Sequence, residues 1–121
     1  MKIGYINVFV SDLERSVRFY TEALGFRVKQ VEKQFGYASF EGGNISFALA
    51  ETDDTTLVGR HIGTGLVVNN IDTVYQALLT KGVTFKMPPT EQPWGGILAL
   101  LKDPDGNIFY LDPVITAPHS H

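Results

Sequence analysis

Few side chains in this 121-residue sequence could carry out a reaction, and they do not form a known catalytic arrangement. The chain has no cysteine, which excludes thiolate catalysis, disulfides and zinc–sulfur sites. His61 is the only histidine inside the predicted folded unit, and it is a candidate general base or ligand anchor. The alternative is a histidine at the start of a strand that hydrogen-bonds to backbone or water. No Ser–His–Asp arrangement can be assembled around it.

Asp112 is the carboxylate best placed for acid–base chemistry. It shares strand parity with Tyr110, so both side chains are expected on one face of the last strand. The run from 103 to 107, Asp-Pro-Asp-Gly-Asn, is also rich in carboxylates, but the physics of turns accounts for it. Asp caps its own backbone, Pro fixes φ, and Gly and Asn permit a positive φ. We therefore interpret this run as a turn, and Asp112 and His61 remain the catalytic candidates.

Aromatic residues are the more distinctive feature. Trp94, the only tryptophan, lies in a Pro-Trp-Gly-Gly loop, where an exposed ring is costly unless it covers something. Side chains alternate between the two faces of a strand, so Tyr5, Asn7 and Phe9 are expected on one face of the first strand. For Phe9 and Phe47 the alternative is that their rings fill the core. The predicted ligand-binding residues are Tyr5, Asn7, Phe9, Phe47, Trp94 and Tyr110.

Two similar halves must position these side chains. The segment Gly43–Leu49 is echoed by Gly106–Leu111, and Val8–Leu13 is echoed by Leu66–Ile71. In the first half we expect strands over 3–10, 26–32, 35–40 and 45–50, with a helix from Leu13 that stops at Gly25. In the second half we expect strands over 62–68, 83–87, 96–101 and 108–111, with a helix over 71–79 that stops at Gly82. The prolines Pro88 and Pro89 should end the 83–87 strand.

The predicted fold class is therefore α+β, with two βαβββ repeats that form curved mixed sheets around a groove. At this length the chain is expected to be a single domain over 1–121. The boundaries that we predict are 1–50 for the first repeat, 51–60 for a linker, 61–113 for the second repeat and 114–121 for a flexible tail.

Charge and hydropathy narrow the classes of partner. The formal net charge is −3, and the basic residues are dispersed among acidic ones, which argues against binding to nucleic acid. No stretch approaches the roughly 18 apolar residues that a transmembrane helix needs. The N-terminus has no long apolar run of the kind found in a signal peptide, so we expect a cytoplasmic protein without membrane partners.

The motifs together, in this order, resemble the vicinal oxygen chelate superfamily, which groups glyoxalase I, bleomycin-resistance proteins and extradiol dioxygenases. The resemblance covers the chain up to Pro113 and implies the fold described above and a homodimer, which is common in that family. The motifs that carry it are Val10–Ser16, Phe19-Tyr20, Leu24–Phe26, Leu79–Val83, Pro93–Gly96 and Asp103–Asn107.

Metal-using members of that family have ligands at four positions, and the resemblance allows these to be placed in this chain. They correspond to Tyr5, Phe47, Gly63 and Tyr110. Phenylalanine and glycine side chains have no lone pair to donate, and a tyrosine must first lose a proton with a reference pKa of about 10. The resemblance therefore implies a member without the usual metal site, and we expect no cofactor.

The leading hypothesis is metal-independent, sequestration-type binding of a small planar or cationic aromatic molecule, similar to bleomycin-resistance-type proteins. On this hypothesis the protein is not an enzyme, and its partners are a small-molecule ligand and a second copy of itself. The alternative is a glyoxalase- or dioxygenase-like lyase or dioxygenase with displaced metal ligands such as His61 and Asp112, or metal-free acid–base catalysis. Metal analysis and a screen of cationic aromatic compounds separate the two.

Overall fold

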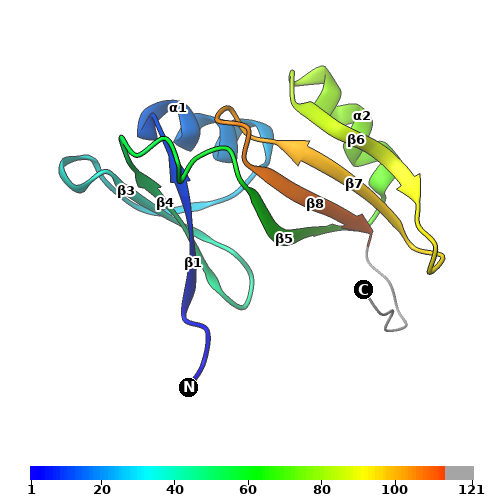
Figure 1. Ribbon diagram of the computed structural model, residues 1–121, viewed down its shortest axis with the longest axis horizontal. Coiled ribbons are helices and arrows are strands. Elements are labelled where there is room, and N and C mark those ends of the chain that lie inside the picture. The colour runs from blue at the N-terminus through cyan, green and yellow to red at the C-terminus, as the bar shows by residue number, and fades with distance from the viewer. Residues whose placement is uncertain (114–121) are drawn as a thin grey trace. The chain divides into compact units, whose positions relative to one another are not determined.

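The computed structural model describes residues 1–113, and the predicted tail at 114–121 lies outside the described residues. The chain forms two compact units, which we treat one at a time (Figure 1). Unit 1 consists of Met1–Arg60 together with Pro104–Asn107. Unit 2 consists, within the described residues, of His61–Asp103 and 108–113. Each unit contains one four-stranded mixed sheet, so the predicted pair of βαβββ units is confirmed.

Unit 1 has the strand order β1-β4-β3-β2, with β1 parallel to β4 and the other pairs antiparallel. The parallel pair is possible because a helical segment connects β1 to β2 and returns the chain to the far edge of the sheet. Its elements are β1 (Tyr5–Val10), α1 (Leu13–Arg18), a π-helical turn (Phe19–Ala23), β2 (Val28–Glu32), a 3-10 turn (Lys33–Phe35), β3 (Tyr37–Glu41) and β4 (Ser46–Glu51).

Unit 2 repeats this arrangement with the strand order β5-β8-β7-β6. Strand β5 is parallel to β8, and the remaining pairs are antiparallel. Its elements are β5 (His61–Val68), α2 (Ile71–Thr80), β6 (Thr84–Glu91), β7 (Ile97–Lys102) and β8 (Ile108–Pro113).

Both helices begin and end where the sequence places the signals. The side chains of Asp12 and Asn70 cap α1 and α2 by accepting hydrogen bonds from the backbone N–H groups three residues later, at 3.0 and 3.1 Å. Gly25 and Gly82 follow the helical segments with φ of 79° and 84°, the left-handed region that favours glycine. The first helical segment differs from prediction in one respect, since it widens into a π-helical turn from Phe19 onward.

Each helix packs on one face of its own sheet, α1 on β3 and β4 and α2 on β6 and β8 (Figure 1). In unit 1 the helix-facing side chains include Val8 and Val10, which are fully buried, and an aromatic cluster of Tyr20, Phe26, Phe40 and Phe47. In unit 2 they are mainly aliphatic, with Leu101, Phe109 and Leu111 buried. The opposite surface of each sheet carries no helix of its own unit, and we call it the helix-free face.

One strand continues further than predicted. Strand β6 runs through Pro88 and Pro89 to Glu91, although these prolines were expected to end it. The strand lies at the edge of its sheet, where a missing N–H can face away from the ladder, and its register shifts between Met87 and Thr90. Proline is tolerated at edges and bulges for this reason.

The Asp103–Asn107 turn does more than shape its own backbone. Asp105 accepts hydrogen bonds from the backbone N–H of Ser11 at 2.9 Å, from the Ser11 hydroxyl and from the Arg15 guanidinium at 3.0 Å. Asn107 is fully buried, accepts from the N–H groups of Gly59 and Arg60, and donates to the carbonyl of Phe9. The predicted turn is present, and the side chains of Asp105 and Asn107 also connect it to both ends of the 1–60 segment of unit 1.

The segment predicted as a linker, 51–60, begins with the last residue of β4, and all of it clusters with unit 1. Inside it, hydrogen bonds from the hydroxyl and then the backbone N–H of Thr56 hold the pKa of Asp54 below its ordinary value. Among residues 1–113, none of the helices has the length and apolar character needed to cross a membrane.

Candidate functional site

The predicted site residues of unit 1 divide between the two faces of its sheet. Tyr5, Asn7 and Phe9 lie on the helix-free face of β1, as the alternation predicts, and Tyr5 is 63% exposed. Phe47 lies on the helix face, because it pairs with Ile6 across β1 and β4 and not with Tyr5 or Asn7. The structure therefore does not bring Phe47 together with the other three.

Phe47 is part of the aromatic core of unit 1. Its side chain is 5% exposed, its ring stacks on Phe26 at 5.3 Å between centroids, and Tyr20 lies at 5.4 Å. This placement matches the alternative that the sequence left open, in which the ring fills the core. A direct contact of Phe47 with a ligand would require the core of unit 1 to open.

The strand registers also change which residue corresponds to Tyr110. Val10 and Val68 are equivalent ends of β1 and β5, so Asn7 and Gly65 occupy equivalent positions three residues earlier. Asn7 pairs with Ala48, whereas Gly65 pairs with Tyr110. The counterpart of Tyr110 in unit 1 is therefore Ala48, and the spacing from the turn glycine misplaced it by one residue at Phe47.

Unit 2 brings together four of the predicted residues around one cavity on its helix-free face. The cavity has a volume of about 320 Å³ and is lined by Gly63, Gly65, Trp94, Leu98, Tyr110 and Asp112. The ring of His61 does not line it but lies 4.9 Å from the ring of Tyr110. Trp94 and Tyr110 are thus neighbours in the folded unit, and both candidates for acid–base chemistry lie beside them. We call this space the glycine-floored cavity.

Two glycines on β5 create the space. Gly65 pairs with Tyr110, and a Cβ atom added to Gly65 would meet nothing within 4 Å. Gly63 has a φ of 77° and interrupts the register of β5, and its N–H donates to Nδ1 of His61 at 3.0 Å. An unpaired backbone stretch of this kind is typical of a β-bulge. Directly across the strand pair, Tyr110 faces Gly65, which has no side chain.

Trp94 is placed by the short loop between β6 and β7. The loop closes with hydrogen bonds between Gln92 and Gly96 at 2.7 Å and between Gly95 and Gln92 at 2.9 Å. A Cβ atom at Gly96 would lie 2.6 Å from Nε1 of the indole, so glycine at this position lets the ring fold back over the loop. The indole remains 40% exposed, which leaves part of its face accessible.

The lining of the cavity combines two aromatic rings with a single carboxylate. Asp112 is the one charged residue among those that line it, and the two rings present electron-rich faces. Cavities of roughly 300 Å³ and above are the usual size for small-molecule sites. Sequence reasoning found Trp94, Tyr110 and Asp112 but missed Gly65 and Leu98, although the Gly-Thr-Gly spacing on β5 was a signal for an unfilled strand face.

The donor atoms do not fit a divalent metal of the kind that metal-using relatives hold. The corresponding positions are Tyr5, Ala48, Gly63 and Tyr110, and none of them supplies a carboxylate or an imidazole. Within the described part of the chain, no three side chains of His, Asp or Glu lie close enough to form a metal site. A single carboxylate, Asp112, is too little for the three or four donors that such ions require.

Comparison with known proteins agrees with this architecture. The family model for the Glyoxalase/Bleomycin resistance protein/Dioxygenase superfamily matches residues 2–111. The protein YraH of Bacillus subtilis (strain 168) is 28% identical over 121 residues, which cover 89% of this chain and 94% of YraH.

Two solved structures are similar over nearly the whole chain. A member of the same superfamily from Sphaerobacter thermophilus DSM 20745 has 30% identity and a TM-score of 0.75, and the match covers 94% of this chain and 98% of that one. TnmS3, an antibiotic binding protein from Streptomyces sp. CB03234, has 27% identity and a TM-score of 0.81, with 95% and 97% covered. The chain belongs to the Glyoxalase/Bleomycin resistance protein/Dioxygenase superfamily.

Proposed function

We propose that this protein binds a small planar aromatic molecule, preferably a cation, in the glycine-floored cavity and does so without a metal. The observation that carries the proposal is the meeting of Trp94 and Tyr110 around a space that Gly63 and Gly65 leave empty. Ring stacking contributes about 0.5–1.5 kcal/mol per contact beyond burial, and a cation over a ring adds about 0.5–2 kcal/mol. Two rings, a carboxylate and the buried apolar area together are enough for micromolar affinity.

The family supports binding as a function without reaction. TnmS3, to which this chain is similar over almost its whole length, is an antibiotic binding protein, and this similarity supports a binding role. Sequestration needs a shaped cavity and contact area, and it does not need donor atoms that polarise a substrate. The cavity offers the first two features, since its lining is formed by rings, an aliphatic side chain and bare backbone.

A pair of matched three-ring probes tests the proposal. 9-Aminoacridine is a cation at neutral pH, whereas acridine-9-carboxylate has the same ring system and a negative charge. Isothermal titration should give micromolar binding of 9-aminoacridine and at least about tenfold weaker binding of the carboxylate. Tryptophan emission should change with the same midpoint, because Trp94 is the only tryptophan. Absence of heat and unchanged emission with both probes would contradict the proposal.

A second function follows from the position of two titratable groups. His61 lies beside Tyr110, and Asp112 lines the same cavity, which is the arrangement that metal-free acid–base catalysis would need. The superfamily includes glyoxalases, so the hemithioacetal of glutathione and methylglyoxal is the appropriate trial substrate. Turnover by metal-free protein that is lost in Asp112→Asn, with an unchanged circular dichroism spectrum, would favour this function over sequestration.

A further inference from the structure

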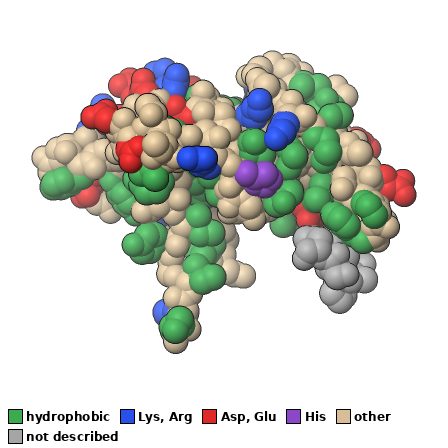
Figure 2. Space-filling model, in the orientation of Figure 1, with side chains coloured by type: hydrophobic (Ala, Val, Ile, Leu, Met, Phe, Trp, Pro, Cys, Tyr) green, Lys and Arg blue, Asp and Glu red, His purple; other side chains and the backbone are tan. Residues whose placement is uncertain are grey.

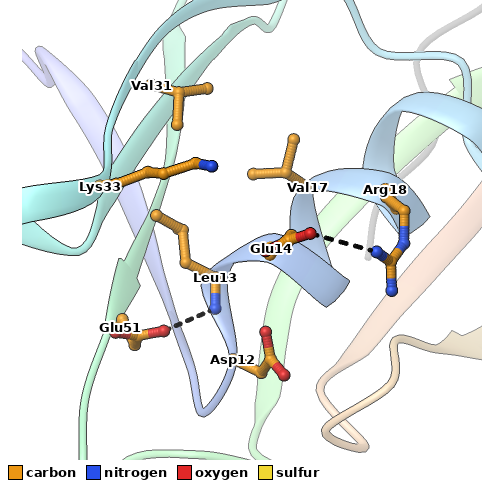
Figure 3. Close-up of a pocket in the computed structure, with 8 residues that line it drawn as sticks. All are labelled: Asp12, Leu13, Glu14, Val17, Arg18, Val31, Lys33 and Glu51. Carbon is orange, nitrogen blue, oxygen red and sulfur yellow. Dashed lines mark hydrogen bonds and ion pairs between the residues drawn. The ribbon is translucent and has the colours of Figure 1, made fainter.

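Unit 1 contains a second cavity, on the helix side of its sheet and separate from the glycine-floored cavity of unit 2. It lies between α1 and the edge strand β2 and has a volume of about 470 Å³ (Figure 3). Its apolar lining is formed by Leu13, Val17 and Val31. We call this space the helix–strand groove.

The other repeat shows why the groove exists. Val17 of unit 1 corresponds to Tyr75 of unit 2, because each lies seven residues after the equivalent valines Val10 and Val68. Val28 corresponds to Phe85, because each lies three residues after the glycine that follows the helix, Gly25 or Gly82. In unit 2 the two rings pack edge to face with centroids 4.7 Å apart, between α2 and the edge strand β6. Unit 1 has two valines in their place, and Val28 is left 38% exposed. The short side chain of Val17 thus lines the groove at the position where the second repeat has the ring of Tyr75.

The charged residues around the groove are not equivalent. Figure 3 shows Glu51 turned to the N–H of Leu13, at 2.8 Å, and Glu14 turned to Arg18, at 3.5 Å. Asp12 accepts from the backbone of Arg15. All four flanking carboxylate and guanidinium groups are therefore already engaged, Asp12 and Glu51 by backbone N–H groups and Glu14 with Arg18. The ammonium of Lys33 projects across the opening toward Val17 (Figure 3), and in residues 1–113 it has no hydrogen bond or ion pair.

We propose that the helix–strand groove binds an amphiphilic monocarboxylate, whose apolar chain or ring lies on Leu13, Val17 and Val31 and whose carboxylate pairs with Lys33. The size of the groove admits a molecule of about ten heavy atoms with space to spare. Burial of the exposed Val31 and the half-buried Val17 supplies the driving force, and the ammonium of Lys33 selects the sign of the head group. This site is independent of the function proposed for unit 2.

Octanoate and octylammonium are matched probes, because they differ in the charge of the head group and share the chain. Titration of the ¹⁵N-labelled full chain, followed by amide shifts in NMR spectra, locates the bound probe. Octanoate should shift amides in 13–18 and 31–33 and leave those of 63–65 and 110 unchanged. Octylammonium should bind several times more weakly.

Two substitutions test the two halves of the proposal. Lys33→Met keeps an apolar stem and removes the charge, and it should weaken octanoate binding about three- to fivefold, the range of an exposed ion pair. Val17→Tyr installs the side chain of the other repeat and should abolish binding by filling the groove. Lys29→Met is the control, because Lys29 lies on β2, the strand that leads into the turn with Lys33, but donates to Ser46 on the other face.

Three outcomes would overturn the proposal. They are octanoate shifts confined to other parts of the chain, equal binding of octanoate and octylammonium, or unchanged octanoate affinity in Lys33→Met. If Val17→Tyr fails to fold, the Lys33→Met and Lys29→Met pair still decides the question, since both side chains are exposed.

Discussion

The two repeats place bulky side chains on opposite strands of the same parallel pair. In unit 1 the edge strand carries Tyr5 and Asn7, and its partner β4 carries Ala48 on the same face. In unit 2 the edge strand carries glycines, and its partner β8 carries Tyr110. Equivalent backbones thus produce a polar, exposed strand in one unit and a cavity with an aromatic wall in the other. The difference teaches that side-chain volume on two neighbouring strands, and not the fold, determines which repeat has a cavity at this position of its helix-free face.

The two units also differ in where aromatic rings are buried on the helix side of the sheet. Unit 1 packs a cluster of aromatic rings beneath its helix, whereas unit 2 packs aliphatic side chains there and uses Tyr75 and Phe85 to fill the edge of the sheet. Rings therefore fill the interior of unit 1, whereas in unit 2 the rings of Trp94 and Tyr110 line a cavity. The predictions below test this division.

The largest effect is expected from truncation of an aromatic core residue. Phe47→Ala should lower the free energy of unfolding by about 3–5 kcal/mol, because it leaves a cavity among three packed rings. Tyr110→Ala, on the helix-free face of unit 2, should cost about 1 kcal/mol or less while it weakens 9-aminoacridine binding. Urea unfolding measures the free energy of unfolding of both variants. Similar losses in the two would contradict the division between a structural ring in unit 1 and a cavity-lining ring in unit 2.

A smaller loss is expected from the turn before β8. Asn107→Ala removes the amide oxygen that accepts from the N–H groups of Gly59 and Arg60. It also removes the amide nitrogen that donates to the carbonyl of Phe9, and the side chain is fully buried. We expect a loss of about 2–4 kcal/mol in the free energy of unfolding. The sequence echo of Asn107 in the first half is Asn44, which is exposed. Asn44→Ala should therefore be nearly neutral, and equal losses in the two variants would show that the buried bonds are unimportant.

The sequence predicted the fold well because its signals are local and repeated. Asp12, Asn70, Gly25 and Gly82 define the helical segments without reference to the rest of the chain. The continuation of β6 through Pro88 was missed because tolerance of proline depends on the strand's position at an edge, which only the sheet order shows.

The candidate site was predicted only in part, for a related reason. Trp94, Tyr110 and Asp112 carry recognisable chemistry, so inspection of the sequence found them. The role of Gly65 depends on its partner across β5 and β8, and the face of Phe47 depends on the register of β1 and β4. A shift of one residue reverses the face of a strand side chain, so spacing counted from a turn could not assign Phe47.

The smallest effect is expected at Ser16, on the buried side of α1. Its hydroxyl is fully buried and, within the described part of the chain, has no hydrogen-bond partner. Ser16→Ala removes this unsatisfied group and improves helix propensity, so the free energy of unfolding should stay within about 0.5 kcal/mol or rise. A measured loss above about 1 kcal/mol would show that the hydroxyl makes a bond in solution.

The most direct test of the central claim fills the space that the glycines leave. Gly65→Val adds bulk where a Cβ atom meets nothing within 4 Å, and Gly4→Val adds the same bulk at an equally open position in unit 1. Isothermal titration with 9-aminoacridine should show at least about a tenfold loss of affinity in Gly65→Val and wild-type affinity in Gly4→Val. Wild-type affinity in a folded Gly65→Val protein would contradict the account.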